Sequence, residues 1–200
     1  MLKTIIILIF TSLLSSCSLA PFSSQKSGKS YGAGKSQFEL GTANTSYYMK
    51  AGFGISANMD LGFVTEFGGF TTSGIFTRYS FINNEIGPAL AMELGYGSSD
   101  TTTYYYGGLI GSLSFSKSFE LFINPRVITV SSDVTDIDLG ETVGNVTLNE
   151  YDVNYLYVSA GFNIWFTEVA GLSIYTIFLK GDGLETTEDQ TTAGTMMFRF

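Results

Sequence analysis

The chain ends in Thr195-Met196-Met197-Phe198-Arg199-Phe200. Apolar side chains occupy positions 196, 198 and 200, and the residues between them include the charged Arg199. Because alternate residues of a β-strand face opposite sides, this segment would have one apolar face and one mixed face. We therefore predict that a β-strand closes the chain, with an aromatic side chain as its last residue.

The rest of the chain repeats this alternation in short runs. Charged residues make up 14% of the sequence, against about 25% in ordinary soluble domains. No stretch reaches the roughly 18 apolar residues of a spanning helix. We predict an all-β fold over residues 37–200, an antiparallel up-and-down transmembrane β-barrel of ten strands, with eight as the alternative. The predicted strands are 37–43, 46–56, 59–70, 74–82, 88–98, 104–115, 119–131, 151–166, 171–180 and 191–200.

The connections between these segments alternate in length. The tight links are 57–58, 83–85, 116–118 and 167–170, and the two long ones are 132–150 and 181–190. Outer-membrane barrels keep short turns in the periplasm and longer loops outside the cell. With an even number of strands, the tight turns and the C-terminus would all lie on the periplasmic side.

The two faces of the predicted strands differ in chemistry. One face gathers apolar residues such as Phe63, Leu94 and Ile123, which suits contact with lipid hydrocarbon. The opposite face gathers four acids and four bases: Glu39, Glu66, Glu93, Glu120, Lys50, Arg78, Arg126 and Arg199. Because an unpaired charge in a low-dielectric lumen is costly, we interpret these residues as a lumenal ion-pair network that plugs the barrel.

Two other interpretations of the faces stay open. The mixed charges also suit a narrow channel for small solutes or ions, although a barrel of eight to ten strands has little room once its side chains are packed. Alternatively, the apolar face points inward around a ligand, in a soluble barrel that a lipid tethers to the membrane.

The N-terminal segment has the pattern of an export signal. Lys3 precedes an apolar stretch, residues 4–14, which is too short for a membrane anchor. Residues 14–17, Leu-Ser-Ser-Cys, resemble the lipobox of bacterial lipoproteins, in which the cysteine carries lipid and begins the mature chain. We favour a signal peptide over residues 1–16, lipid attachment at Cys17 and a flexible tether over residues 17–36; ordinary cleavage after Ala20 is the alternative.

The composition argues against several functions. The chain has no histidine, which removes His-based acid–base catalysis and most transition-metal sites, so we predict neither an enzyme nor a cofactor. Its net charge of −8 argues against a nucleic-acid partner. One acidic segment offers a weak calcium candidate, formed by Asp133, Asp136, Asp138 and Glu141.

The tail resembles the C-terminal sorting signal of bacterial outer-membrane β-barrels, which typically end in Phe with another aromatic two residues earlier. Phe198 and Phe200 carry this resemblance. Together with the strand rhythm, it indicates the OmpA-type and related small outer-membrane barrel families. The resemblance implies a monomer in the bacterial outer membrane, in contact with its lipids and delivered by the barrel-assembly machinery. We expect a structural or surface-interaction role through the acidic segments 131–152 and 181–190.

Overall fold

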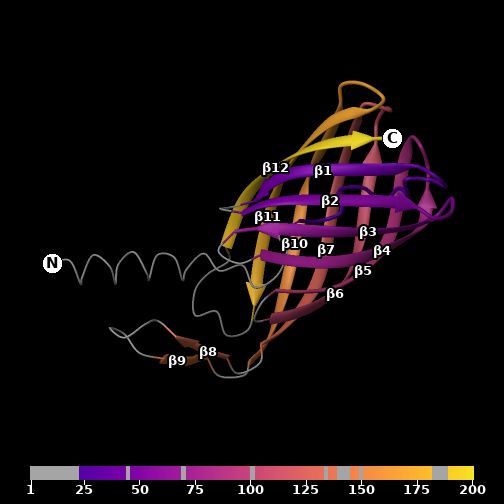
Figure 1. The fold of residues 1–200 in the computed structure, drawn as a ribbon. Helices are drawn as coiled ribbons and strands as arrows, with labels where there is room; N and C mark the ends of the chain where they lie inside the picture. The colour runs from indigo at the N-terminus through magenta and orange to yellow at the C-terminus, as the bar shows by residue number, and fades with distance from the viewer. Residues whose placement is uncertain are drawn as a thin grey trace.

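The fold consists of a closed β-barrel and a second, two-stranded sheet (Figure 1). The computed structural model describes residues 23–43, 46–68, 71–99, 102–132, 135–138, 145–148, 151–181 and 189–200. Among these residues, no helix is long and apolar enough to cross a membrane.

Twelve strands lie within the described residues, and ten of them form the barrel. The barrel strands are β1 (Ser36–Ala43), β2 (Ser46–Gly54), β3 (Met59–Phe67), β4 (Thr71–Asn83), β5 (Gly87–Ser98), β6 (Thr102–Ser114), β7 (Phe119–Ser132), β10 (Tyr151–Trp165), β11 (Ala170–Gly181) and β12 (Asp189–Arg199). Each strand pairs antiparallel with its two neighbours in the barrel, and β10 is the neighbour of β7. The prediction of ten barrel strands is confirmed, and the alternative of eight is wrong. The short pair β8 (Thr135–Asp138) and β9 (Asn145–Leu148), within the long connection, was not predicted.

The last strand closes the barrel against the first. β12 pairs with β1 in a register that sets Phe198 opposite Phe38. At the end of this seam, the backbone amides and carbonyls of Ser36 and Phe200 exchange two hydrogen bonds of 2.9 Å. The C-terminal segment therefore forms the predicted strand, which begins earlier, at Asp189, than the sequence pattern indicates.

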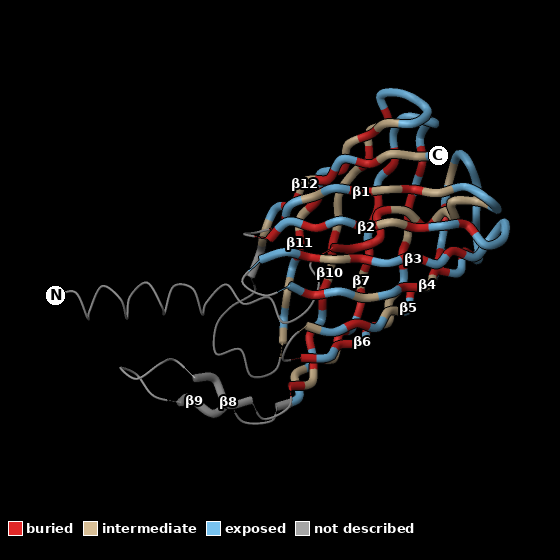
Figure 2. The backbone as a smooth tube through the Cα atoms, in the orientation of Figure 1, coloured by how far each residue is buried: buried red, intermediate tan, exposed pale blue. Residues whose placement is uncertain are grey.

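Alternation between exposed and buried residues runs around the whole barrel (Figure 2). In β2, buried residues take every second position, and the same period of two holds in β3 and β7. Phe63, Leu94 and Ile123 are each about half exposed, so the apolar face points outward. The interpretation of a soluble barrel with its apolar face around an internal ligand is therefore wrong.

Three of the tight turns share one local structure. Ser56, Ser116 and Thr167 each follow the end of a strand, and each hydroxyl accepts hydrogen bonds from the backbone amides two and three residues further on. Hydroxyl side chains stabilise reverse turns in this way. These turns lie at the end of the barrel where β1 starts and β12 finishes, here called the short-turn end. The opposite end, which carries the connections 133–150 and 182–188, is called the long-loop end.

Candidate functional site

The structure places the predicted charged residues inside the barrel. Arg199 is partly exposed at the short-turn end. The other seven are at most 3% exposed: Glu39, Lys50, Glu66, Arg78, Glu93, Glu120 and Arg126. Successive side chains of each strand point to opposite faces of the sheet, so the residues between the outward-facing ones meet in the lumen.

Arg78 forms its ion pair with Asp60, a residue that was not predicted to lie in the lumen. It stands opposite Glu93 in the β4–β5 register, yet its Nη2 lies 2.6 Å from Oδ2 of Asp60 on β3, and its Nε donates to the same oxygen at 2.8 Å. Asp60 is fully buried. Because Asp60 and Glu66 lie six residues apart on the same strand, the two-residue period alone indicates that both face inward.

Aromatic rings contact the other guanidinium groups. The Cζ atom of Arg126 lies 3.9 Å from the ring centre of Tyr157 and 4.8 Å from that of Tyr106. Tyr106 in turn donates its hydroxyl to Oε1 of Glu93 at 2.8 Å. A cation over an aromatic face is attracted by the ring quadrupole. The lumen therefore stabilises charge through rings as well as through the ion pairs that we expected.

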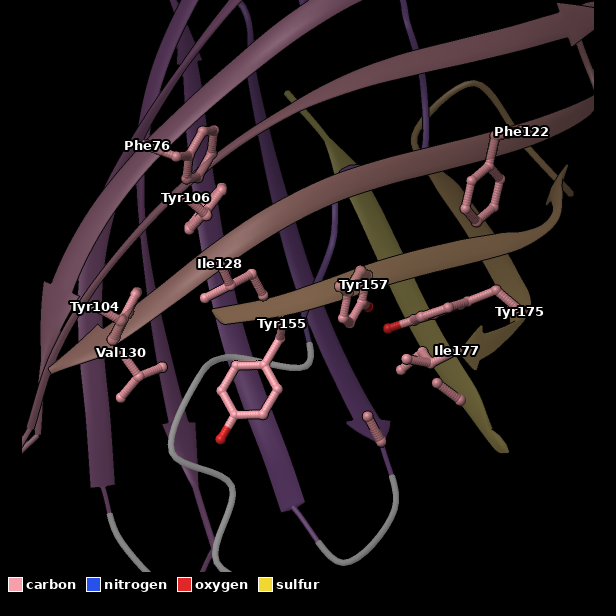
Figure 3. Close-up of a cluster of buried hydrophobic side chains, with 12 residues drawn as sticks. Phe76, Tyr104, Tyr106, Phe122, Ile128, Val130, Tyr155, Tyr157, Tyr175 and Ile177 are labelled. Carbon is pink, nitrogen blue, oxygen red and sulfur yellow. The ribbon is translucent and has the colours of Figure 1, made fainter. Parts of the chain in front are cut away.

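The lumen also holds more aromatic side chains than we predicted. A buried cluster includes Phe76, Tyr104, Tyr155 and Tyr175, whose rings come from β4, β6, β10 and β11 (Figure 3). Inward-facing glycines make space for such rings. The Tyr104 ring fills the position that a side chain at Gly97 would take, and these two residues are cross-strand partners in β5 and β6. Glycines on the inner face thus accommodate aromatic rings of the next strand.

A segment before the first strand lies inside the barrel. We call residues 23–35 the inner segment. Ser23 to Lys26 are at most 4% exposed, whereas residues 17–36 were expected to be a flexible tether. Lys26 forms an ion pair with Glu39, and Nζ of Lys29 lies 3.7 Å from Oε1 of Glu120. The prediction of a flexible tether is therefore wrong for residues 23–31, which are packed in the lumen, where carboxylates pair with the two lysines.

The inner segment is held mainly by its backbone. Its carbonyls at residues 24, 25, 26 and 27 each accept a hydrogen bond from the lumen wall, and each donor comes from a different strand. The donors are Lys50 Nζ to Ser24 at 3.0 Å, Asn124 Nδ2 to Gln25 at 3.2 Å, Asn163 Nδ2 to Lys26 at 2.7 Å and Arg78 Nη1 to Ser27 at 2.9 Å. These contacts satisfy carbonyls that would otherwise be buried without a partner.

The inner segment runs along the barrel from the long-loop end to the short-turn end. The Ser23 amide donates to Glu66 at 2.5 Å, close to the last residue of β3. The Tyr31 amide donates to Asp60 at 3.0 Å, at the start of the same strand. The chain then reverses into β1 through Gly32 and Gly34, with φ of 88° and 75°, a region that glycine adopts without strain.

Several predicted residues lie outside the described part of the structure. These are the signal peptide, the lipid site Cys17, and Asp133 and Glu141 of the calcium candidate. Asp136 and Asp138 belong to β8, but their side chains are not among those described. Among the described residues there is no group of three or more His, Cys, Asp or Glu that could hold a metal ion.

The outer surface of the barrel indicates the environment in which it is stable. The ten barrel strands pair around a complete circle, so their backbone polar groups find partners within the sheet. Leu61, Ile75, Leu109 and Met196 are examples of large apolar residues on the outer face, with exposures of 46%, 59%, 51% and 55%. Closure and an apolar outer face are what hydrocarbon requires of a spanning sheet. The protein is built as a membrane-spanning β-barrel.

No protein-family model matches this chain, and no curated protein matches its sequence. Solved structures similar to it include a β-barrel domain, a porin and an outer-membrane protein. The N-terminal barrel domain of Pseudomonas aeruginosa OprF is 10% identical, over 84% of this chain and 99% of that one, with a TM-score of 0.40. The KdgM porin is 7% identical over 83% and 99%, with a TM-score of 0.42. Omp33 of Acinetobacter baumannii is 8% identical over 83% and 97%, with a TM-score of 0.37.

Proposed function

We propose that the protein is a non-enzymatic outer-membrane barrel whose lumen is closed in the resting state, and that its role is structural or surface-interacting. The observation that carries the proposal is the inner segment, whose four successive carbonyls are hydrogen-bonded to four strands of the wall. In the proposed resting state, backbone and buried ion pairs fill the lumen, so that solutes have no continuous path through it. The acidic segments 131–152 and 181–190 would then be the surface that meets other molecules, at the long-loop end.

Purified protein in planar lipid bilayers is expected to give no steady single-channel openings. The physical reason is that the inner segment and its partners occupy the lumen, with Ser24 and Gln25 at most 1% exposed. Current recordings at several voltages and salt concentrations would check this. Steady openings of uniform size would instead favour the second candidate function, a narrow channel for small solutes or ions.

A Cys17→Ala variant is expected to remain in the membrane fraction and to need detergent for extraction. The apolar outer face requires hydrocarbon whether or not a lipid is attached to the N-terminus. The measurement is the partition of the variant between aqueous buffer and detergent extract of outer membranes, with the native chain alongside. Release of the variant into buffer would mean that lipid, and not the strands, holds the protein in the membrane.

A further inference from the structure

The contacts of the inner segment have the form of a binding site for extended polypeptide. Besides the four carbonyls, four backbone amides of residues 23–31 are bound by side chains of the wall. The amides of Ser23, Gly28, Ser30 and Tyr31 donate to Glu66, Ser112, Asn83 and Asp60. Backbone carbonyls and amides are present in every peptide, so most of these contacts do not depend on which side chains the segment carries. Selectivity comes from a few additional contacts, such as the Lys26–Glu39 ion pair.

The inner segment is linked to the barrel wall at one end. It joins the barrel covalently only through the turn at Gly32 and Gly34, after which β1 begins. Ala33 and Gly34 are exposed. A ligand tethered in this way has a high effective concentration at its site, which is lost when the tether is cut.

Without the inner segment, the wall would still present charged side chains to the lumen, beside the buried aromatic cluster. A barrel of about eight strands is just filled by its own side chains, whereas this ten-stranded barrel has space for a backbone as well. Among the described residues, the wall carries five inward acids, Glu39, Asp60, Glu66, Glu93 and Glu120, and four inward bases, Lys50, Arg78, Arg126 and Arg199. The two lysines that pair with Glu39 and Glu120 belong to the inner segment. Removing it therefore leaves a slight excess of negative charge.

We propose that the lumen is a peptide-binding site occupied by the chain's own inner segment, and that the barrel becomes a narrow pore for small hydrated cations when this segment leaves. The resting barrel is closed because the inner segment of the same chain occupies the site. Any event that withdraws the segment, such as a pull on the N-terminus or competition by another extended peptide, opens the passage. The proposal goes beyond the closed structural role, since it gives the same lumen a second, conducting state.

The test is a full-length Cys17→Ala variant with a specific protease site inserted between Ala33 and Gly34. The Cys17→Ala change ensures that no lipid retains the released fragment. Before cleavage the variant is expected to be silent in planar bilayers. After cleavage and a wash in mild urea, with loss of the fragment verified by mass spectrometry, we expect steady openings with a reversal potential that indicates a weak preference for cations.

A synthetic peptide of residues 23–33 added to the cleaved barrel is expected to restore silence. The same peptide with Lys26→Glu should block at least tenfold less well, because it would set a carboxylate against Glu39. Cleaved and washed protein that stays silent would overturn the proposal, while silence of the uncleaved protein would still support the closed resting state. An anion-selective pore would overturn the argument from the charges of the wall.

A second variant tests the same proposal without cleavage. Asn124→Leu combined with Asn163→Leu removes two of the four carbonyl donors without changing the charge of the lumen. The inner segment should then leave more often, and brief openings should appear. Asn154→Leu is the matched control, because Asn154 lies on β10 with Asn163 but is exposed and bonds to Thr129. Equal silence of the double variant and the control would count against the proposal.

Discussion

Oxidation of a Ser24→Cys, Ser159→Cys variant is expected to join the inner segment covalently to β10 in nearly every molecule. The hydroxyl oxygens of these two serines lie 2.9 Å apart, and both side chains are fully buried. A disulfide needs Cβ atoms about 3.5–4.5 Å apart, which a small adjustment of this pair provides. The experiment uses a Cys17→Ala background, because Cys17 is the only cysteine of the chain.

The cross-link can be measured on denaturing gels without reductant. Ser24 and Ser159 are separated by 135 residues in the sequence, so the disulfide closes a large loop and the heat-denatured chain should migrate faster. Ser24→Cys with Ser112→Cys is the control. Ser112 contacts Gly28, four residues further along the inner segment, or about 13 Å in extended chain. Cross-linking of both pairs to the same extent would mean that the inner segment has no fixed register in the lumen.

The outer face of the barrel could be predicted from the sequence because lipid imposes a simple rule. Each spanning strand must present apolar side chains at every second position, and this period fixes the inward position of residues such as Glu66 and Glu120 without further information. The same period would have revealed Asp60. The identity of partners within the lumen could not be predicted, since Arg78 has both Glu93 and Asp60 on neighbouring strands. The two-residue period places both carboxylates beside Arg78 and does not tell which of them forms the ion pair.

The inner segment could not be recognised because its sequence is that of a linker. Residues rich in Ser, Gly and Lys bury little apolar surface and are typical of solvated chain. In this barrel the segment is fixed through its carbonyls, which leave no trace in the sequence. Only Lys26 and Lys29 indicate that the segment could enter the lumen. When Asp60 is counted among the inward charges, the wall has more acids than bases, and these lysines can supply the missing positive charge.

An Arg78→Met variant is expected to lose about 3–5 kcal/mol of stability, the usual effect of removing one partner of a buried ion pair. Asp60 would stay in the lumen without its cation, although Ser30 Oγ and the Tyr31 amide still donate to it at 2.7 and 3.0 Å. These two bonds should place the loss near the lower end of that range. Urea unfolding in lipid vesicles, followed by Trp165 fluorescence, would measure it.

Lys117→Met is the matched control, because it removes a cation from an ion pair at the surface. Nζ of Lys117 lies 2.8 Å from Oε1 of Glu85 at the short-turn end, and both side chains are more than 70% exposed. The hydrogen bond between them lowers the pKa of the Glu85 carboxyl and raises that of Lys117, but water screens such pairs, and we expect no measurable change in stability. Adding Asp60→Asn to Arg78→Met should recover part of the loss, since the double variant no longer buries an uncompensated charge. If Arg78→Met and Lys117→Met unfold at the same urea concentration, the Arg78–Asp60 pair does not stabilise the lumen.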